Sequence, residues 1–128
     1  MITLDASVLI AHFRSADEHH LPAGRLLSDR AGEGFAVHPL NLAEVLVGGV
    51  RIGRAAEMLA DLHDMGVEVS ESMPDEPIGL ATLRAKSGLK LPDCCALHTA
   101  MTHGTPLATF DDALSAVARR HGVEVLPG

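Results

Sequence analysis

The first thirteen residues, Met1 to Phe13, constrain the fold most strongly, because they are almost entirely apolar around one acidic residue, Asp5. Residues 1–4 are rich in β-formers and residues 7–11 resemble the start of a helix, so Asp5 is expected at the end of a strand. A buried ionised carboxylate is unfavourable unless a cation or hydrogen-bond donors compensate it. Because ligands of parallel α/β sheets bind at the carboxyl ends of strands, Asp5 is the first candidate metal ligand.

The rest of the chain repeats this alternation of strand and helix. Further strands are expected at 35–38, 67–69, 105–109 and 123–126, and helices at 17–31, 39–50, 54–65, 77–86, 93–103 and 111–120. Strands that alternate with helices predict a parallel sheet with right-handed crossovers. The length of 128 residues, without a repeat or a linker, predicts one α/β domain over residues 1–128.

Hydropathy and cysteine content indicate in which cellular compartment the protein is expected. No apolar run reaches the roughly 18 residues of a membrane span, and no basic leader opens the chain, so we expect a cytoplasmic protein without a membrane segment. The two cysteines, Cys94 and Cys95, are adjacent and offer neither a disulfide framework nor metal-ligand spacing. We interpret them as small core residues in a reducing compartment, and their sequence indicates no further role.

Charge and aromatic content restrict how the chain can bind nucleic acid. A formal charge of −7 excludes coating of nucleic acid by bulk electrostatics, but it permits a nuclease whose bound divalent ions invert the local charge. Aromatic residues make up only 2% of the chain, so base-stacking platforms for single strands are not expected. The pair His19 and His20 is interpreted as part of a surface turn, and no histidine is assigned a catalytic role.

Four carboxylates stand out because each interrupts an apolar segment near the same predicted edge of the sheet. Glu44 is the only charge in residues 39–50, and Asp93 begins a helix whose expected core stripe includes Ala96 and Met101. Asp111 follows the strand at 105–109, as Asp5 follows the first strand. We therefore predict that these four carboxylates meet in one cleft.

Each member taken alone has a simpler explanation. Asp5, Asp93 and Asp111 suit helix N-caps, and Glu44 suits a partly exposed helix position. As a group, however, crowded carboxylates repel one another, and an all-oxygen site suits Mg²⁺ or Mn²⁺. The sequence contains no His-Glu-x-x-His motif, no Cys/His pairing and no Gly-rich phosphate loop, so zinc and nucleoside-triphosphate sites lack support.

The ordered set of motifs resembles the PIN-domain family, and within it the VapC-type toxins of prokaryotic toxin–antitoxin pairs. The resemblance spans essentially the whole chain and rests on four segments: Asp5-Ala6-Ser7, Ala43-Glu44, Pro92-Asp93 and Ala108-Thr109-Phe110-Asp111. It implies a sheet of four to five strands in the order 3-2-1-4-5, flanked by about seven helices.

The resemblance also implies a function. It implies an endoribonuclease in which Asp5, Glu44, Asp93 and Asp111 hold Mg²⁺ or Mn²⁺, with support from the hydroxyl groups of Ser7 and Thr109. Asp112 leaves the fourth ligand ambiguous, although the Thr-x-Asp spacing favours Asp111. An RNA substrate, a cognate antitoxin and a homodimer are implied as partners. Lys86 and Lys90, which precede Asp93, are candidate contacts to the RNA backbone.

Two other classes of protein fit the sequence less well than a nuclease does. A catalytically inactive PIN-like module that only binds proteins would be expected to lack at least one of the four acids. A phosphoacceptor receiver domain would require clustered acids after the first strand and a lysine after a later strand, whereas Asp5 stands alone and no lysine follows Thr109. The many apolar residues of helices 39–50 and 54–65, such as Val47 and Leu59, suit either core packing or an interface.

Overall fold

The computed structural model describes residues 1–127 and centres on a five-stranded parallel sheet. Its strands are β1 (Ile2–Leu4), β2 (Phe35–Val37), β3 (Val67–Val69), β4 (Leu107–Ala108) and β5 (Val125–Leu126). They pair in the order β3-β2-β1-β4-β5, all parallel, which confirms the expected fold class. The C-terminal limit of the expected domain, Gly128, lies outside the described residues.

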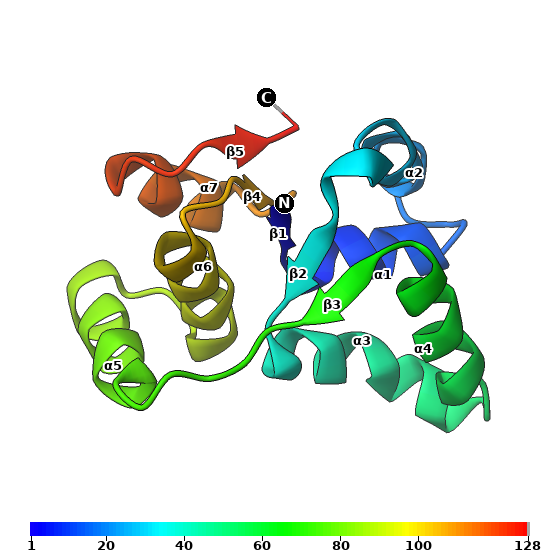
Figure 1. Ribbon diagram of the computed structural model, residues 1–128, viewed down its shortest axis with the longest axis horizontal. Coiled ribbons are helices and arrows are strands. Elements are labelled where there is room, and N and C mark those ends of the chain that lie inside the picture. Colours follow the sequence, from blue (N-terminus) through cyan, green and yellow to red (C-terminus); the bar gives the residue numbers. More distant parts are fainter. Residues whose placement is uncertain (128) are drawn as a thin grey trace.

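Seven α-helices connect and cover these strands within residues 1–127. They are α1 (Ala6–Phe13), α2 (His20–Asp29), α3 (Pro39–Arg51), α4 (Ala55–Asp64), α5 (Glu76–Ser87), α6 (Leu91–His103) and α7 (Asp112–Arg120), with a 3₁₀ turn η1 (Ala31–Glu33) after α2. Helices α1 to α4 gather on one side of the central strand β1 and α5 to α7 on the other (Figure 1). Among the described residues, no helix is long and apolar enough to cross a bilayer.

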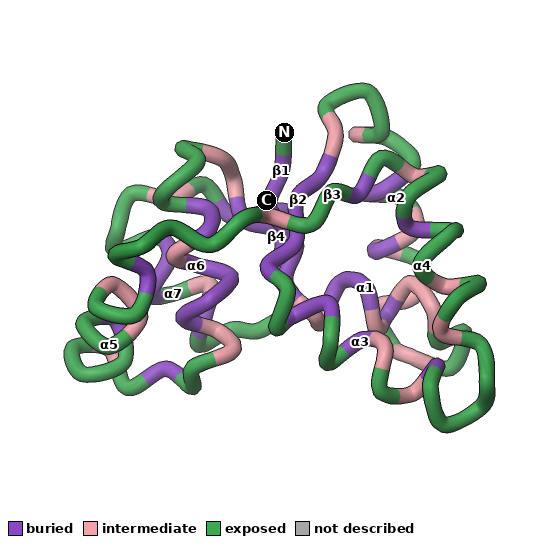
Figure 2. The backbone as a smooth tube through the Cα atoms, turned by 60° about the horizontal axis from the view of Figure 1, so that its bottom comes forward, coloured by how far each residue is buried: buried purple, intermediate pink, exposed green. Residues whose placement is uncertain are grey.

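The alternation of side chains along the strands divides the core between these two helical layers. Leu4, Ala108 and Leu126 are in register on three adjacent strands, and all belong to the hydrophobic cluster that includes α1 and α2. Leu107 and Val125 point the other way and pack with α6 and α7. Because neighbouring residues of a strand face opposite sides, strands buried on both faces are largely apolar, and the buried Thr3 of β1 satisfies its hydroxyl through that of Thr105 at 2.7 Å. Figure 2 shows these strands as the buried centre of the chain.

Helix α6 departs from the sequence prediction in two ways. It begins at Leu91 rather than at Asp93, because Lys90 is extended and Pro92 is accommodated in a first helical turn, where no backbone N–H is required. Met101, expected in the core stripe, is 42% exposed, whereas Cys94 and Cys95 are buried as predicted. Helix α6 packs against α3, α5, α7 and the sheet, so its buried surface is not one narrow stripe.

The strand order singles out one edge of the sheet, which is formed by the carboxyl ends of the strands. From β1 the chain proceeds outward to β2 and β3, and it then returns to the other side of β1 to form β4 and β5. Such a reversal leaves a crevice at the carboxyl ends of the strands on either side of it. Asp5 follows β1 directly and Thr109 follows β4 directly, so both residues lie at this crevice.

Candidate metal centre at the carboxyl edge of the sheet

Asp5 is buried and held by hydrogen bonds from three directions. Its Oδ1 accepts from the Ser7 hydroxyl at 2.7 Å and from the Val8 backbone N–H at 3.2 Å, and its Oδ2 accepts from the Thr109 hydroxyl. Burial raises the pKa of Asp5, the three hydrogen bonds act to lower it, and the charge of Asp111 raises it further. Asp5 therefore caps α1, as the simpler explanation required, and also faces the other acids.

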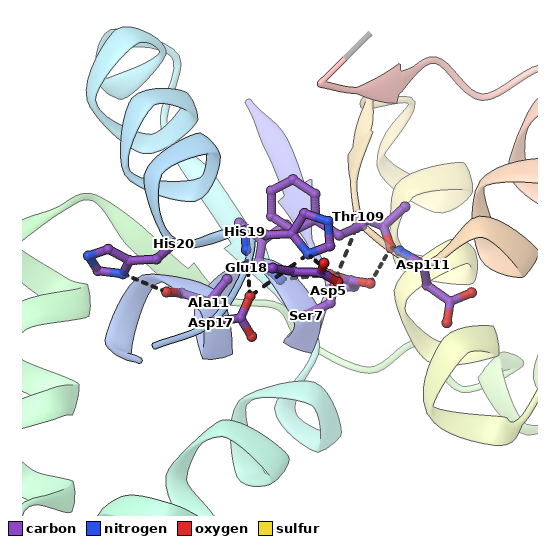
Figure 3. A network of polar contacts seen from close by, with 11 residues as sticks. Asp5, Ser7, Ala11, Asp17, Glu18, His19, His20, Thr109 and Asp111 are labelled. Carbon is purple, nitrogen blue, oxygen red and sulfur yellow. Dashed lines mark hydrogen bonds and ion pairs between the residues drawn. The ribbon is translucent and has the colours of Figure 1, made fainter. Parts of the chain in front are cut away.

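Ser7 and Thr109 tie the ends of β1 and β4 together, as Figure 3 shows around Asp5. The Ser7 hydroxyl accepts from the backbone N–H of Phe110 at 3.0 Å while it donates to Asp5. The Thr109 hydroxyl accepts from the backbone N–H of Asp111 at 3.0 Å while it also donates to Asp5. These bonds form a closed network, which fixes the position of the Asp5 carboxylate relative to the β4–α7 turn.

The structure separates Asp111 from its neighbour Asp112. Asp111 is the N-cap of α7, where its Oδ1 accepts from the Leu114 backbone N–H at 2.8 Å, and its charge raises the pKa of both Asp5 and Asp93. Asp112 is the first residue of the helix and lines a different cleft, together with His19 and Phe110. The geometry therefore places Asp111 on the side of the other acids.

Glu44 reaches the same edge from α3 through an asparagine that sequence reasoning missed. The Asn41 amide Nδ2 donates to Glu44 Oε1 at 3.4 Å and to the carbonyl of Pro92 at 3.0 Å, so it links α3 to the start of α6. Asn41 is buried, and its Oδ1 is a buried oxygen without a hydrogen-bond partner in residues 1–127. The available signal was its polar side chain at a core position of an apolar helix, one turn before Glu44.

Asp93 shows that the four carboxylates act on one another. Burial raises the pKa of Asp93 to about 6, and the charges of Asp111, Asp5 and Glu44 each contribute, against a lowering effect of Lys90. Asp93 lies in the first turn of α6, whose N-cap is Lys90, so the N-cap explanation for Asp93 is wrong. Carboxylates on separate elements thus lie close enough for the charges of the other three to act on Asp93, and their role as one site stays a prediction.

These residues fit a hard divalent cation. A carboxylate has about four acceptor positions, and Asp5 uses three of them, which leaves one for a further partner. The donor set consists of oxygen atoms alone, and the excess negative charge is what a cation would neutralise. Lys90 is close enough to influence Asp93, whereas Lys86 is an exposed residue near the end of α5.

A second cluster of ligand-type side chains, His38, Glu76 and Cys95, lies close by. Within residues 1–127 it is the one group of three or more such residues whose ligand atoms all lie within 4.8 Å, so the four acids are more widely spaced. His38 Nδ1 accepts from the Leu40 backbone N–H at 3.0 Å, so its proton is on Nε2, which donates to Glu76 Oε1 at 2.5 Å.

That hydrogen bonding disfavours a metal at the second cluster. A metal-bound histidine usually donates its other ring N–H to an acceptor, but here the other nitrogen of His38 is itself an acceptor. Burial raises the pKa of Cys95 to about 11, and the charge of Glu76 adds to this, so the thiol stays protonated. Burial acts to raise the pKa of Glu76, but hydrogen bonds from Ser72 and His38 outweigh it, and the net shift is downward. The cluster is a polar contact between the N-cap of α3 and the helices α5 and α6, in which His38 and Glu76 already hydrogen-bond to each other.

Comparison with solved structures finds the same fold in proteins of low sequence identity. Mycobacterium tuberculosis VapC20, described as a sarcin–ricin loop cleaving toxin, aligns with a TM-score of 0.78 at 18% identity, over 91% of this chain and 95% of that chain. A toxin–antitoxin complex from Klebsiella pneumoniae aligns with a TM-score of 0.68 at 24% identity, over 91% of each chain. VapBC2 from Rickettsia felis, bound to a promoter DNA fragment, gives 0.70 at 14%, over 98% and 97%. At these identities the likeness concerns the fold.

Sequence comparison supplies the family. No curated protein matches the sequence. The family model described as PIN domain matches residues 2–120, which include every strand except β5 and all four carboxylates of the crevice. This chain therefore belongs to the PIN-domain family.

Proposed function

We propose that this protein is a metal-dependent endoribonuclease, the toxin of a type II toxin–antitoxin pair, whose site is formed by Asp5, Glu44, Asp93 and Asp111. The observation that carries the proposal is the raised pKa of Asp93, which arises from burial and from the charges of the other three acids. Four carboxylates that repel one another at a strand-order reversal would be stabilised by a bound cation at neutral pH. The PIN-domain membership and the solved toxin structures support the reaction class.

In this proposal the four carboxylates would hold Mg²⁺ or Mn²⁺. When bound, such a cation lowers the pKa of a coordinated water and stabilises negative charge on a phosphodiester. The hydroxyl groups of Ser7 and Thr109 hydrogen-bond to the two oxygens of the Asp5 carboxylate and so fix its orientation. Asn41 does the same for Glu44 and also fixes the start of α6 on which Asp93 lies.

The protein's own charge makes RNA access dependent on the cation. Because the pKa values of Asp5 and Asp93 are both raised, protons compete with a cation for these carboxylates as the pH falls. Without a cation the acidic crevice repels the RNA phosphates. Lys90, next to Asp93, and Lys86 are proposed contacts to the RNA backbone on this side of the crevice.

Cleavage of total cellular RNA by the purified protein tests the proposal. Discrete fragments with 5′-phosphate ends are expected with Mg²⁺ or Mn²⁺, and neither EDTA-treated protein nor Asp5→Asn should produce them. A thermal unfolding scan with and without Mn²⁺ accompanies the assay, since a cation that binds the folded state raises Tm. Absence of both cleavage and a Mn²⁺-dependent shift would favour the inactive binding module instead.

A protein partner is proposed from the surface of α3 and α4. Val47, Val50 and Ile52 are 47%, 67% and 70% exposed, and Leu59 is 43% exposed, so the apolar excess noted in the sequence lies partly at the surface. Exposed apolar side chains that gather on neighbouring elements are typical of protein interfaces. We expect a homodimer and a cognate antitoxin to cover such surfaces. Light scattering after gel filtration, with Val50→Lys as the variant, tests the dimer.

A further inference from the structure

Two aromatic rings stack beside the acidic crevice. The His19 and Phe110 rings are parallel, with centroids 4.4 Å apart and planes inclined by 5°. His19 immediately precedes α2, and Phe110 lies between Thr109 and Asp111, both of which belong to the Asp5 network. His19 and Thr109 line the same cleft, and Figure 3 draws His19 together with the Asp5–Thr109 network. The stack therefore joins the α1–α2 loop to the β4–α7 turn at the rim of the candidate site.

Both rings are anchored through their own backbones. The Phe110 N–H donates to the Ser7 hydroxyl at 3.0 Å, and the His19 N–H donates to the Asp17 carboxylate at 2.8 Å. The His19 ring also lies 3.8 Å from the carboxylates of Asp17 and Glu18. Its side chain retains 39% of its accessible surface. Because Phe110 covers one face of the ring, that exposed surface belongs to the opposite face and the edges.

An open cleft of about 420 Å³ adjoins the stack, a size that accepts a nucleobase with its sugar and phosphate. It lies between the stack, the first turns of α7 and the strand β5, and it is lined by His19, Phe110, Asp112, Ser115 and Arg119. The guanidinium of Arg119 has no ion-pair partner among residues 1–127, so it is free to meet an anion. Asp112 gives the cleft a negative group as well.

We propose that this cleft binds one nucleotide of the RNA strand next to the cleaved bond. Its base extends the His19–Phe110 stack, and its phosphate meets Arg119. Unpaired bases bind to proteins largely by stacking on aromatic planes, and each stacked base contributes about 1–3 kcal/mol. Stacking needs no net positive surface, which suits a chain of charge −7, and this single pair of rings offers a place for one base although an aromatic content of 2% predicts no extended stacking platform. The RNA assignment rests on the proposed nuclease, but the base contact itself does not require cleavage.

The contact is tested first without metal or turnover. Adenosine 5′-monophosphate is titrated into EDTA-treated protein and followed by NMR, with ribose 5-phosphate as the probe that lacks a base. The monophosphate should shift the ring resonances of His19 and Phe110, and ribose 5-phosphate should leave them nearly unchanged. His19→Ala should weaken the binding at least about fivefold. His103→Ala is the matched control and should bind as the wild type does. His103 is an exposed histidine at the C-terminal end of α6 and does not line the cleft.

Phe110→Leu keeps an apolar side chain of similar size but removes the aromatic face, so it guards against an effect of misfolding. It should weaken binding in the same direction as His19→Ala, with an unchanged circular dichroism spectrum. An equal response to both probes, or full affinity in both ring variants, would overturn the proposal.

A second measurement connects the cleft to the reaction. In an RNA that the wild type cuts, single abasic nucleotides are placed on either side of the cleaved bond. One abasic position should lower kcat/KM about 5-fold or more in the wild type, and the same position should have little effect in His19→Ala. If the wild type cuts RNA but tolerates every abasic position, the stacking proposal is wrong and the nuclease stands. If the monophosphate binds at the rings but no RNA is cut, the base contact stands and the nuclease proposal is wrong.

Discussion

Two groups of ligand-type side chains lie close together in this protein, one buried and one with only Asp5 buried, and they differ in how their charges are satisfied. His38, Glu76 and Cys95 are close together, yet the histidine donates to the glutamate, the thiol keeps its proton, and the backbone of Leu40 occupies the remaining ring nitrogen. Asp5, Glu44, Asp93 and Asp111 are more widely spaced, yet each negative charge raises the free energy of ionising Asp93.

The difference teaches that proximity of ligand atoms is a weaker sign of a cation site than unsatisfied charge. In the first group His38 and Glu76 are already hydrogen-bonded to each other, so a cation would have to break that bond before it bound. In the second group a cation would relieve repulsion and fill the acceptor position that Asp5 retains. This contrast predicts that the two groups respond differently to substitution.

The largest expected effect separates the groups by activity. Asp93→Asn preserves the shape of the side chain but removes a ligand, so cleavage should fall by at least about 1,000-fold. Cys95→Ala, two residues further along the same helix, should remain within about threefold of wild type if its thiol binds no metal. Rates on one RNA at saturating Mn²⁺ provide the comparison. Equal losses in the two variants would erase the contrast.

The second prediction concerns the stability that His38 supplies. His38→Ala removes the acceptor of the Leu40 N–H and one of the two hydrogen-bond donors of the buried Glu76, so unfolding free energy should fall by about 2–3 kcal/mol. His38→Asn, whose side chain still caps α3, should recover about 1 kcal/mol of that loss. Urea denaturation measures both variants. A loss below about 0.5 kcal/mol in His38→Ala would show that the contact contributes little.

The third prediction uses the pH dependence of Asp93. Its pKa is raised from 3.8 to about 6 in the folded protein, so the folded state holds this proton more tightly than the unfolded state does. Stability should therefore decline as pH rises from about 4 to 6 and stay low above that. In EDTA at pH 7.5, Asp93→Asn should be more stable than wild type by about 1–2 kcal/mol after solvent screening. The advantage should vanish below pH 4; an advantage independent of pH would contradict the repulsion argument.

The smallest effect has the opposite sign. The pKa of Glu76 lies below its usual value of 4.5, because the hydrogen bonds from Ser72 and His38 outweigh burial. Its contribution to stability is therefore present above pH 4.5 and is lost as pH falls below that value. Glu76→Gln should be less stable than wild type at pH 6 and should approach it in acid. Thermal unfolding between pH 3 and 6 follows the difference, and parallel curves would rule the contribution out.

Much of this arrangement could be predicted from the sequence, because it depends on local patterns. The alternation of strands and helices predicts a parallel sheet, and an acid that interrupts an apolar segment at the end of a strand must lie at the sheet edge. Asp5 and Asp111 follow directly from that logic. Glu44 and Asp93 required only the additional assumption that helices after neighbouring strands start at the same edge.

The remaining contacts join residues whose separation no local pattern encodes. The bond between His38 and Glu76 depends on how the segment after β3 returns to the sheet, and that segment has no hydrophobic periodicity. His19 was expected on a surface turn and is indeed partly exposed, but its stacking partner Phe110 lies on a distant strand end. The sequence pattern predicts the start of α6 two residues late. A proline often marks a helix boundary, but Pro92 lies in the first turn of α6.

The reversal of strand order between β1 and β4 has a consequence for biosynthesis. One half of the crevice, with Asp5 and Glu44, comes from the first 51 residues, and the other half comes from residues 91–111. A nascent chain can form α1, β2 and α3 early, but it cannot close the crevice until β4 has left the ribosome and inserted beside β1. The two halves of the acidic edge therefore cannot meet before β4 has been synthesised, so a chain interrupted within its first 90 residues holds Asp5 and Glu44 without their partners.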